Sequence, residues 1–484
     1  MKIEIKNNCI VSDISREQSL EIQNRLTLDN PKYIDAIKQG YRPFTLPATL
    51  SFYKDLSDGN QPDQNQKPDQ NQKPDQNQKP DQNQKLEVPA GFICELKKMA
   101  KRDGSAPVVI DKRTLCDPIV FQFHGKLRPS QARACEGFIH AEFGVLHAPT
   151  GSGKTAMALW LVARRSQPAL VVVHTRELLD QWVKSASTFL GIPRKEVGVI
   201  GSGKFETGEK ITIAMVQTLA RRGSELDFSP GCLIMDECHR VPAMQFVKSV
   251  SRFDSRFRTG LTATPFRRDR LSEVIFWYMG EIKGKIEKKE LIRTENLCEA
   301  EVVWVKTSFY TDTDASADYA RALLELTRDR DRNRQVCESA VAQSHKGICL
   351  VLSDRKKHCS EIAGILDRCH GINAFVLTGS TPEKERKHII NELRRQNSGY
   401  LVATGQLVGE GFDLPGITSL VMTCPVRFSG RVIQYMGRIL RPAPGKKSAV
   451  IIDFVDEKMP VFAASARARF LTYKQEGVFR QVVL

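Results

Sequence analysis

From about residue 121 onward, apolar runs of strand length alternate with stretches of helical pattern. The run ALVVVHT at 169–175 precedes RELLDQWVKSASTFL, and GICLVLS at 347–353 is followed by RKKHCSEIAGILDRC. Strands that are apolar throughout, each followed by a helix, are typical of parallel sheets with helices on both faces. The alternation falls into two blocks, 121–295 and 296–484, each the size of one doubly wound domain. The pattern therefore predicts an α/β fold with two tandem parallel-sheet domains.

The first 120 residues do not share this pattern, and we interpret 1–120 as a small N-terminal accessory unit. It is interrupted at 61–85 by QPDQNQ, three copies of KPDQNQ and a final lysine. Because this period contains no apolar residue, it cannot bury a face, and we expect a disordered insertion within a hairpin or loop. The aromatic residues before the insertion, Phe44, Phe52 and Tyr53, are expected to pack in a core rather than to stack on bases.

Composition and charge narrow the class of protein. Hydrophobic residues make up 41% and charged residues 26%, as in ordinary soluble proteins. No apolar run approaches the ~18 residues of a membrane span and no apolar signal segment opens the chain, so we expect a cytoplasmic protein without membrane contact. The 12 cysteines are scattered without a CxxC pair, which favours reduced thiols. Of the formal net charge of +16, +15 lies in residues 121–484, which favours a polyanionic partner such as nucleic acid.

One motif indicates a phosphate site. The string APTGSGKT at 148–155 follows the apolar run 143–146 and precedes a helical stretch. Glycines in this setting let backbone amides turn inward around phosphate oxygens at the positive end of a helix. Lysine then reaches the terminal phosphates, and the last threonine can hold Mg²⁺. We predict an ATP and Mg²⁺ site formed by Thr150, Gly151, Ser152, Gly153, Lys154 and Thr155. A second string, GSGK at 201–204, lacks these surroundings and is interpreted as a surface turn.

Two adjacent carboxylates supply candidate chemistry for that site. The apolar run 232–235 reads as a buried strand that delivers Asp236 and Glu237 at its carboxyl end. Asp236 would hold Mg²⁺ together with Thr155, and Glu237 would orient and deprotonate the water that attacks the γ-phosphate. In the second block, QYMGRILRP supplies Gln434, Arg438 and Arg441. The two arginines are three residues apart and would share one helix face, from which they could neutralise charge developing on phosphates.

With these residues in place, the chain resembles the superfamily 2 helicases and translocases of the DEAD/DEAH-box type over roughly residues 121–460. The resemblance rests on motifs in the family's order: LRPSQ (127–131), APTGSGKT, HTRELLDQW (174–182), MVQTL (215–219), DECH (236–239), LTATP (261–265), VLSDR (351–355), TGQLVGEGFD (404–413) and QYMGRILR (434–441). It implies two RecA-like domains. The DECH and LRPxQ forms look closer to the XPB and UvsW branch of DNA helicases than to the DEAD-box RNA helicases.

The resemblance also implies residue roles. Gln131 would contact adenine, and Gly411 and Asp413, with Gly409, would shape the cleft beside the nucleotide. His239, Thr262 and Thr264 would couple hydrolysis to movement. Arg441 would be the main arginine finger. The residues facing the nucleic-acid backbone would be Thr175, Arg176, Gln217, Thr218, Arg355 and Thr404.

These observations predict an ATP-dependent helicase or translocase that acts on nucleic acid, with DNA favoured over RNA, in repair, recombination, mobile-element or defence contexts. An RNA helicase on the same two domains is one alternative. The other is an ATP-switched interaction or motor subunit of a restriction or defence complex. The N-terminal unit could carry contacts to protein partners.

Overall fold

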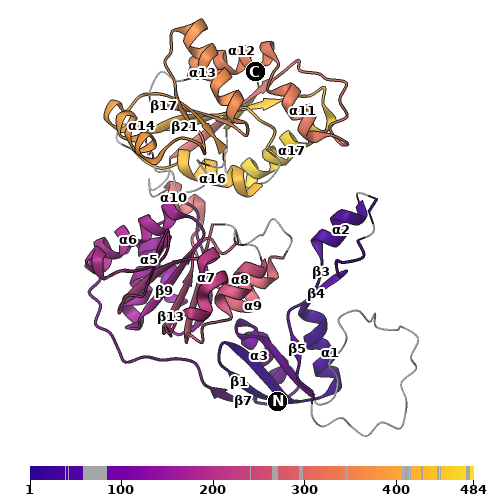
Figure 1. Ribbon diagram of the computed structural model, residues 1–484, viewed down its shortest axis with the longest axis vertical. Helices are drawn as coiled ribbons and strands as arrows, with labels where there is room; N and C mark the ends of the chain where they lie inside the picture. Colours follow the sequence, from indigo (N-terminus) through magenta and orange to yellow (C-terminus); the bar gives the residue numbers. More distant parts are fainter. Residues whose placement is uncertain are drawn as a thin grey trace. The chain divides into compact units, whose positions relative to one another are not determined.

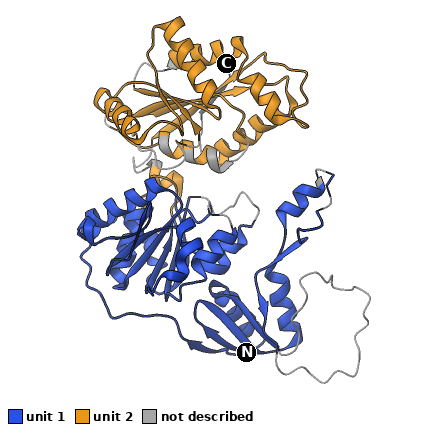
Figure 2. Ribbon diagram, in the orientation of Figure 1, with its two compact units in different colours: residues 1–148, 154–285 blue, residues 149–153, 286–484 orange. Residues whose placement is uncertain are grey.

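The computed structural model describes residues 1–38, 40–41, 43–57, 84–239, 241, 243–263, 271–293, 298–343, 347–405, 407, 414, 416–426, 429–443, 446, 448–475 and 480–483. They form two compact units, residues 1–148 with 154–285 and residues 149–153 with 286–484 (Figure 2). None of the 12 cysteines forms a disulfide bond, and eight of the first ten in the chain are buried. Within the described ranges, no helix is both long enough and apolar enough to cross a bilayer.

The N-terminal unit is built on a five-stranded sheet in the order β5-β6-β2-β1-β7. β1 and β7 are parallel and the other neighbours antiparallel. Alternate residues of β1 and β2 are buried, as expected where one face of a sheet is covered. The elements are β1 (Lys2–Ile5), β2 (Asn8–Ile14), α1 (Arg16–Arg25), β5 (Lys54–Asp55), β6 (Gln84–Pro89), α3 (Ile93–Arg102) and β7 (Val108–Asp111).

The hexapeptide insertion lies between two paired strands. Lys54 of β5 is opposite Glu87 of β6, and the amide of Leu56 donates to the carbonyl of Lys85 at 2.8 Å. The prediction that the insertion interrupts a hairpin is therefore confirmed. Most of the repeat, within 58–83, lies outside the described residues. Its last two residues, Gln84 and Lys85, are the beginning of β6 rather than part of a disordered tract.

The N-terminal sheet shares a hydrophobic core with the first α/β domain. The ring of Phe52 lies 5.3 Å from that of Trp277, and Arg258 Nη2 donates to the carbonyl of Asn7 at 2.9 Å. A Cβ atom on Gly91 would lie 2.7 Å from the backbone nitrogen of Gly280, so only glycine allows this close approach. The N-terminal sheet is consequently packed as part of the first unit.

The aromatic residues of this region separate into two groups. Phe52 is buried and Tyr53 packs against the shared core, as predicted. The prediction is wrong for Phe44, which is 95% exposed. Phe44 belongs to an excursion between β3 (Thr27–Asp29) and β4 (Thr49–Ser51) that contains α2 (Pro31–Lys38). None of the described residues of α2 is fully buried, so this short segment provides no core that could enclose the ring.

The first α/β domain has an eight-stranded sheet in the order β11-β10-β12-β9-β13-β14-β8-β15, parallel except for the β10–β11 hairpin. Right-handed crossovers place α5 and α6 on one face and α7 and α8 on the other (Figure 1). The strands are β8 (Phe143–His147), β9 (Ala169–Val173), β10 (Gly198–Gly201), β11 (Lys204–Glu206), β12 (Ile211–Met215), β13 (Cys232–Met235), β14 (Phe257–Thr262) and β15 (Ile282–Lys285). The helices are α4 (Pro129–Glu136), α5 (Lys154–Arg165), α6 (Arg176–Leu190), α7 (Val216–Arg222), α8 (Ala243–Val250) and α9 (Glu273–Met279). The next helix, α10 (Lys288–Arg293), belongs to the second unit.

The string GSGK at 201–204 is the tight turn between β10 and β11. Ser202 and Gly203 have φ angles of 52° and 86°, and both are exposed. The interpretation of this string as a surface turn is confirmed.

The second α/β domain has a seven-stranded parallel sheet in the order β18-β19-β17-β20-β21-β16-β22. Its strands are β16 (Glu299–Lys306), β17 (Ile348–Ser353), β18 (Phe375–Leu377), β19 (Gly399–Thr404), β20 (Ile417–Met422), β21 (Ser448–Val455) and β22 (Arg480–Val483). The helices are α11 (Tyr319–Leu326), α12 (Arg330–Gln343), α13 (Lys356–His370), α14 (Glu383–Gln396), α16 (Ser429–Ile439) and α17 (Pro460–Gln475). The α/β class with two tandem parallel-sheet domains is thus confirmed.

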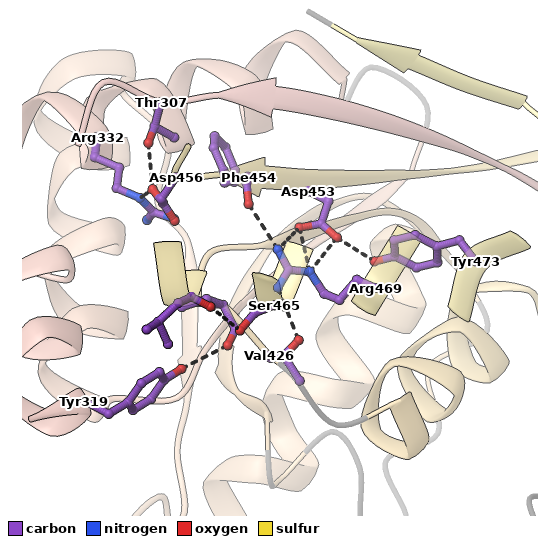
Figure 3. Close-up of polar contacts among 12 residues, drawn as sticks. Thr307, Tyr319, Arg332, Val426, Asp453, Phe454, Asp456, Ser465, Arg469 and Tyr473 are labelled. Carbon is purple, nitrogen blue, oxygen red and sulfur yellow. Dashed lines mark hydrogen bonds and ion pairs between the residues drawn. The ribbon is translucent and has the colours of Figure 1, made fainter. Parts of the chain in front are cut away.

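Buried ion pairs join α17 and α12 to the end of β21 (Figure 3). Arg469 of α17 binds both oxygens of Asp453, with Nε contacts of 3.0 and 2.8 Å, and also donates to the carbonyls of Val426 and Phe454. Tyr473 donates to the same carboxylate at 2.9 Å. Because every oxygen of this buried carboxylate has a donor, the charge is compensated inside the core.

Candidate active site

The phosphate loop joins β8 to α5 with the backbone geometry that the motif requires. Gly151 and Gly153 have φ angles of 85° and 84°, in the region that favours glycine. The amide of Ala148 donates to the carbonyl of Thr262 at 2.9 Å, which ties the start of the loop to the end of β14. Helix α5 begins at Lys154, so the loop leads directly into the positive end of a twelve-residue helix. This arrangement can bind an anion.

Lys154 lies among backbone and carboxylate oxygens. Its Nζ donates to the carbonyl of Ala148 at 3.1 Å and lies 3.6 Å from Oε1 of Glu237. The Lys154 side chain is only 10% exposed, so the ion pair is shielded from solvent. The two residues predicted from separate motifs, 83 positions apart in the chain, are thus brought together at one edge of the sheet.

Asp236 is held by two hydrogen bonds at the carboxyl end of β13. Its Oδ2 accepts from Nε1 of Trp182 at 2.7 Å, and its Oδ1 accepts from the amide of Glu237 at 2.9 Å. Burial, followed by the nearby charge of Glu237, raises the pKa of Asp236 from 3.8 to about 6. A buried carboxylate that is unfavourable as a lone anion is well suited to a cation.

Glu237 has a strained backbone. Its φ of 46° is rare for a residue with a side chain and is the kind of strain that accompanies functional sites. His239 Nδ1 lies 3.4 Å from Oε2 of Glu237 and 2.9 Å from Oγ1 of Thr262, and both His239 and Thr262 are buried. The DECH turn is therefore linked through His239 to the end of β14, and the coupling role of these residues stays a prediction.

The other nucleotide candidates surround the same sheet edge or helix α4. Thr155 lies in the first turn of α5 and is half-buried, and Ser152 is fully buried. Gln131 is 5% exposed, and its Oε1 accepts from the amide of Arg128 at 2.8 Å, which closes the start of α4. This hydrogen bond at the start of α4 is sufficient to account for the buried position of Gln131. A contact of its amide nitrogen with adenine stays a prediction.

The predicted nucleic-acid contacts of the first domain meet where β9 ends. Thr175 caps α6 by accepting from the amide of Leu178, and Arg176 opens the helix with an exposed side chain. Gln217 of α7 donates through Nε2 to the carbonyl of His174 at 3.0 Å. Thr218 follows on α7 and is half-buried. Residues 43 positions apart in two different motifs are therefore in direct contact.

The predicted contacts of the second domain follow neighbouring strands. Thr404 ends β19 and is in register with Ser353 at the end of β17. Arg355 precedes α13, and its Nη2 donates to the carbonyl of Ala320 at 2.7 Å. Both residues thus lie at the carboxyl edge of the second sheet.

One feature of the QYMGRILR segment differs from the prediction. Helix α16 ends at Ile439, so Arg441 lies beyond the helix and does not share a helix face with Arg438. The reason is Pro442, since a residue that precedes proline avoids helical backbone angles. Lys446, which lies in none of the sequence motifs, donates through Nζ to the carbonyls of Ile439 and Arg441. Those contacts hold the turn that carries Arg441.

Several predicted residues lie outside the description. Thr264, Gly409, Gly411 and Asp413 are not among the described residues, and the side chains of Gln434 and Arg438 are not described. Trp182 is a further residue that sequence reasoning missed. Its signal was indirect, because a buried indole N–H needs an acceptor but the sequence does not say which one.

Comparisons with known proteins agree with this geometry. Residues 124–267 match the family described as type III restriction enzyme, res subunit, and residues 331–443 match the helicase conserved C-terminal domain. "Probable helicase D10" of Escherichia phage T5 is 23% identical over 76% of this chain and 80% of its own. "DNA 3'-5' translocase XPB2" of Sulfurisphaera tokodaii is 24% identical over 71% of this chain and 84% of its own.

A solved structure supports the fold. Saccharomyces cerevisiae Dbp5 bound to RNA and ADP BeF3 aligns with a TM-score of 0.52 and 16% identity, over 74% of this chain and 90% of that one. The two sheets with their phosphate loop and the matching helicase domains define an ATP-dependent helicase with two RecA-like domains. The chain carries the two helicase domains of superfamily 2, and its relatives include proteins named as XPB helicases and translocases.

Proposed function

We propose that this helicase is an ATP- and Mg²⁺-dependent motor that acts on DNA. The observation that carries the proposal is the cluster of Lys154, Asp236, Glu237, His239 and Thr262 at one sheet edge, directly beside the phosphate loop. A protein that only binds nucleotide, and does not hydrolyse it, has no need of a carboxylate such as Glu237 next to the lysine of the phosphate loop. Nor does it need a histidine such as His239 that connects this carboxylate to the neighbouring strand.

The residues present fit Mg²⁺ bound with ATP. Asp236 offers a buried carboxylate fixed by two donors, and Thr155 offers a hydroxyl in the first turn of the helix that follows the phosphate loop. Hard oxygen ligands of this kind suit Mg²⁺, which usually binds one or two protein groups together with substrate phosphates. When bound, the ion neutralises negative charge on the phosphates.

The chain's own residues would divide the remaining work. Lys154 is positioned to exchange its contact with Glu237 for a phosphate oxygen, which would leave Glu237 available to accept a proton from the attacking water. His239 contacts Glu237 and is hydrogen-bonded to Thr262, so a change at Glu237 would be transmitted through His239 to Thr262. In the second domain, Arg441 would neutralise charge on the phosphates as the reaction proceeds.

Two observations support DNA as the substrate. The charge excess of +15 in residues 121–484 suits a polyanionic substrate. In addition, one similar protein, of which the match covers 84%, is named as a DNA translocase. RNA shares the phosphate backbone, so the charge does not separate the two substrates. The restriction family matched by residues 124–267 gives the ATP-switched subunit as the second candidate.

The test is steady-state ATP hydrolysis by the purified chain, alone and with single-stranded DNA, duplex DNA, a forked junction or RNA. Glu237→Gln serves as the control for contaminating activity. We expect DNA to stimulate turnover more than RNA does. Stimulation by RNA alone would move the protein to the RNA helicases, and turnover indifferent to every nucleic acid would favour the switched subunit.

A further inference from the structure

A buried tryptophan reaches the proposed metal-binding carboxylate from a neighbouring helix. Trp182 of α6 is fully buried, and its Nε1 donates to Oδ2 of Asp236 at 2.7 Å. The other oxygen accepts from the amide of Glu237. Two donors from separate elements therefore fix both the position and the rotation of the carboxylate.

Packing alone accounts for the ring of Trp182 but not for its hydrogen bond. Helix α6 buries Leu179, Trp182, Ala186 and Leu190, a stripe with helical spacing that any large apolar side chain could complete. The indole N–H, however, is directed to a carboxylate, and a hydrogen bond to an ionised acceptor is about twice as strong as a neutral one. Groups that bond to a metal ligand in this way commonly set its orientation and affinity.

The start of the same helix, two turns before Trp182, carries predicted nucleic-acid contacts. Thr175 caps α6, and the exposed Arg176 is its first residue. Trp182 follows Thr175 by seven residues, which is roughly 10 Å along the axis. Since an uninterrupted helix moves as a unit over two turns, a shift of its first turn also shifts the indole.

We propose that Trp182 is a positioning residue that holds Asp236 for the metal ion and transmits contact of nucleic acid at the start of α6 to that carboxylate. The second half of the statement rests on the proposed function. Engagement of Thr175 and Arg176 by a phosphate backbone would adjust the indole, and the indole would adjust the carboxylate that completes the metal site. Stimulation of turnover would then pass through a single hydrogen bond.

The test uses Trp182→Phe in the full chain, since phenylalanine retains an aromatic ring and removes the donor. Mn²⁺ binding with a non-hydrolysable ATP analogue is followed by electron paramagnetic resonance, which needs no turnover. ATP hydrolysis at saturating Mg²⁺ is measured with and without single-stranded DNA. Trp277→Phe is the matched control, because Trp277 is also buried in the first unit but packs against Phe52. Thermal unfolding is recorded for each variant.

We expect Trp182→Phe to weaken Mn²⁺ binding about tenfold, within the range known for partners of metal ligands, and to lower the stimulation by DNA. The control should change neither quantity by more than about twofold, the margin set by ordinary packing changes. Mn²⁺ affinity equal to that of the unmodified chain would overturn the positioning role. Weakened Mn²⁺ binding with full stimulation would overturn the transmission. Failure of every nucleic acid to stimulate the unmodified chain would instead refute the proposed function and leave the metal measurement valid.

If Trp182→Phe unfolds, benzothienylalanine placed at position 182 repeats the test. Its sulfur replaces the indole N–H and leaves the ring shape almost unchanged, so the buried stripe of α6 is preserved. The expected loss of Mn²⁺ affinity is the same, and retained affinity in this variant would overturn the proposal.

Discussion

Individual residues at the end of β13 combine strain, burial and charge in a small space. Glu237 adopts a left-handed backbone conformation, Asp236 has a buried carboxyl group, and Nζ of Lys154 lies 3.6 Å from Oε1 of Glu237. The backbone conformation of Glu237 and the burial of Asp236 are each unfavourable for folding on their own. Together they form a site that lowers the stability of the fold, as catalytic sites commonly do.

The first residue-scale prediction concerns turnover. Lys154→Ala should reduce the rate of ATP hydrolysis by about 10²- to 10³-fold because a charge that stabilises the transition state is lost. Glu237→Gln should reduce kcat by about 10²- to 10⁴-fold because the general base is lost. The control is Lys204→Ala, since Lys204 ends a similar glycine string in an exposed turn. Unchanged turnover in either of the first two variants would contradict the site.

A second residue-scale prediction concerns pH. The pKa of Asp236 is raised from 3.8 to about 6, so the folded chain binds more protons than the unfolded chain between these values. The stability contributed by protonated Asp236 is full below pH 4 and is lost as pH rises through 6. Without nucleotide or metal, the free energy of unfolding of the wild type, relative to Asp236→Asn, should fall by about 1 to 3 kcal/mol from pH 4 to pH 7.5.

Chemical denaturation of both proteins at several pH values measures this difference. Because the comparison is between two pH values, any fixed cost of the asparagine amide cancels. A difference that is constant with pH would show that Asp236 is not buried as an unfavourable anion.

The site residues that could be predicted from the sequence are those whose role depends on residues next to them in the chain. The phosphate loop was predictable because glycine spacing, strand and helix are consecutive. Trp182 was not, since its acceptor is 54 residues away and only the fold brings the two together. Phe44 shows the opposite error, because aromatic character predicts burial only where enough chain surrounds the ring, and here 95% of it is exposed.

At the scale of elements, the ends of helices and strands determine which side chains meet. The sheets followed from continuous apolar runs, but the end of α16 depends on Pro442, a signal that was present in the sequence and outweighs helical periodicity. Lys446 then completes the turn after α16. Burial lowers the pKa of Lys446 to about 8, so this contact involves an amine that is partly desolvated.

The prediction at this scale concerns the attachment of α17 to β21. Arg469→Met should destabilise the second domain by about 3 to 5 kcal/mol, since Asp453 would remain buried without its cation. Arg321→Met is the control, because its ion pair with Glu325 is exposed to solvent and should contribute much less to stability. Urea unfolding of both variants gives the two values. Equal costs would mean that the buried pair adds nothing beyond packing.

At the scale of the whole molecule, the distribution of charge along the chain can be read from the sequence alone. The excess in residues 121–484 needs no knowledge of the fold, whereas the shared core between the N-terminal sheet and the first α/β domain does. That core depends on contacts such as Phe52 with Trp277, which are too distant in the chain for any local pattern to report.

The whole-molecule prediction is salt dependence. Binding to single-stranded DNA should weaken with a log–log slope of several units, because each neutralised phosphate contributes about −0.7. Arg176→Ala should make this slope shallower by about that amount, and Lys204→Ala should leave it unchanged. Fluorescence anisotropy between 50 and 200 mM salt measures the slopes, a range in which counterion release dominates. Binding that is insensitive to salt would argue against contact along the backbone.

The pairing of β5 with β6 has a consequence for how this gene can vary. Each added or removed copy of the hexapeptide would change the chain by six residues between two strands that pair with each other. Doubling the length of a flexible loop costs only about 0.6 kcal/mol in closure entropy. A change in copy number should therefore alter the free energy of unfolding by less than about 1 kcal/mol.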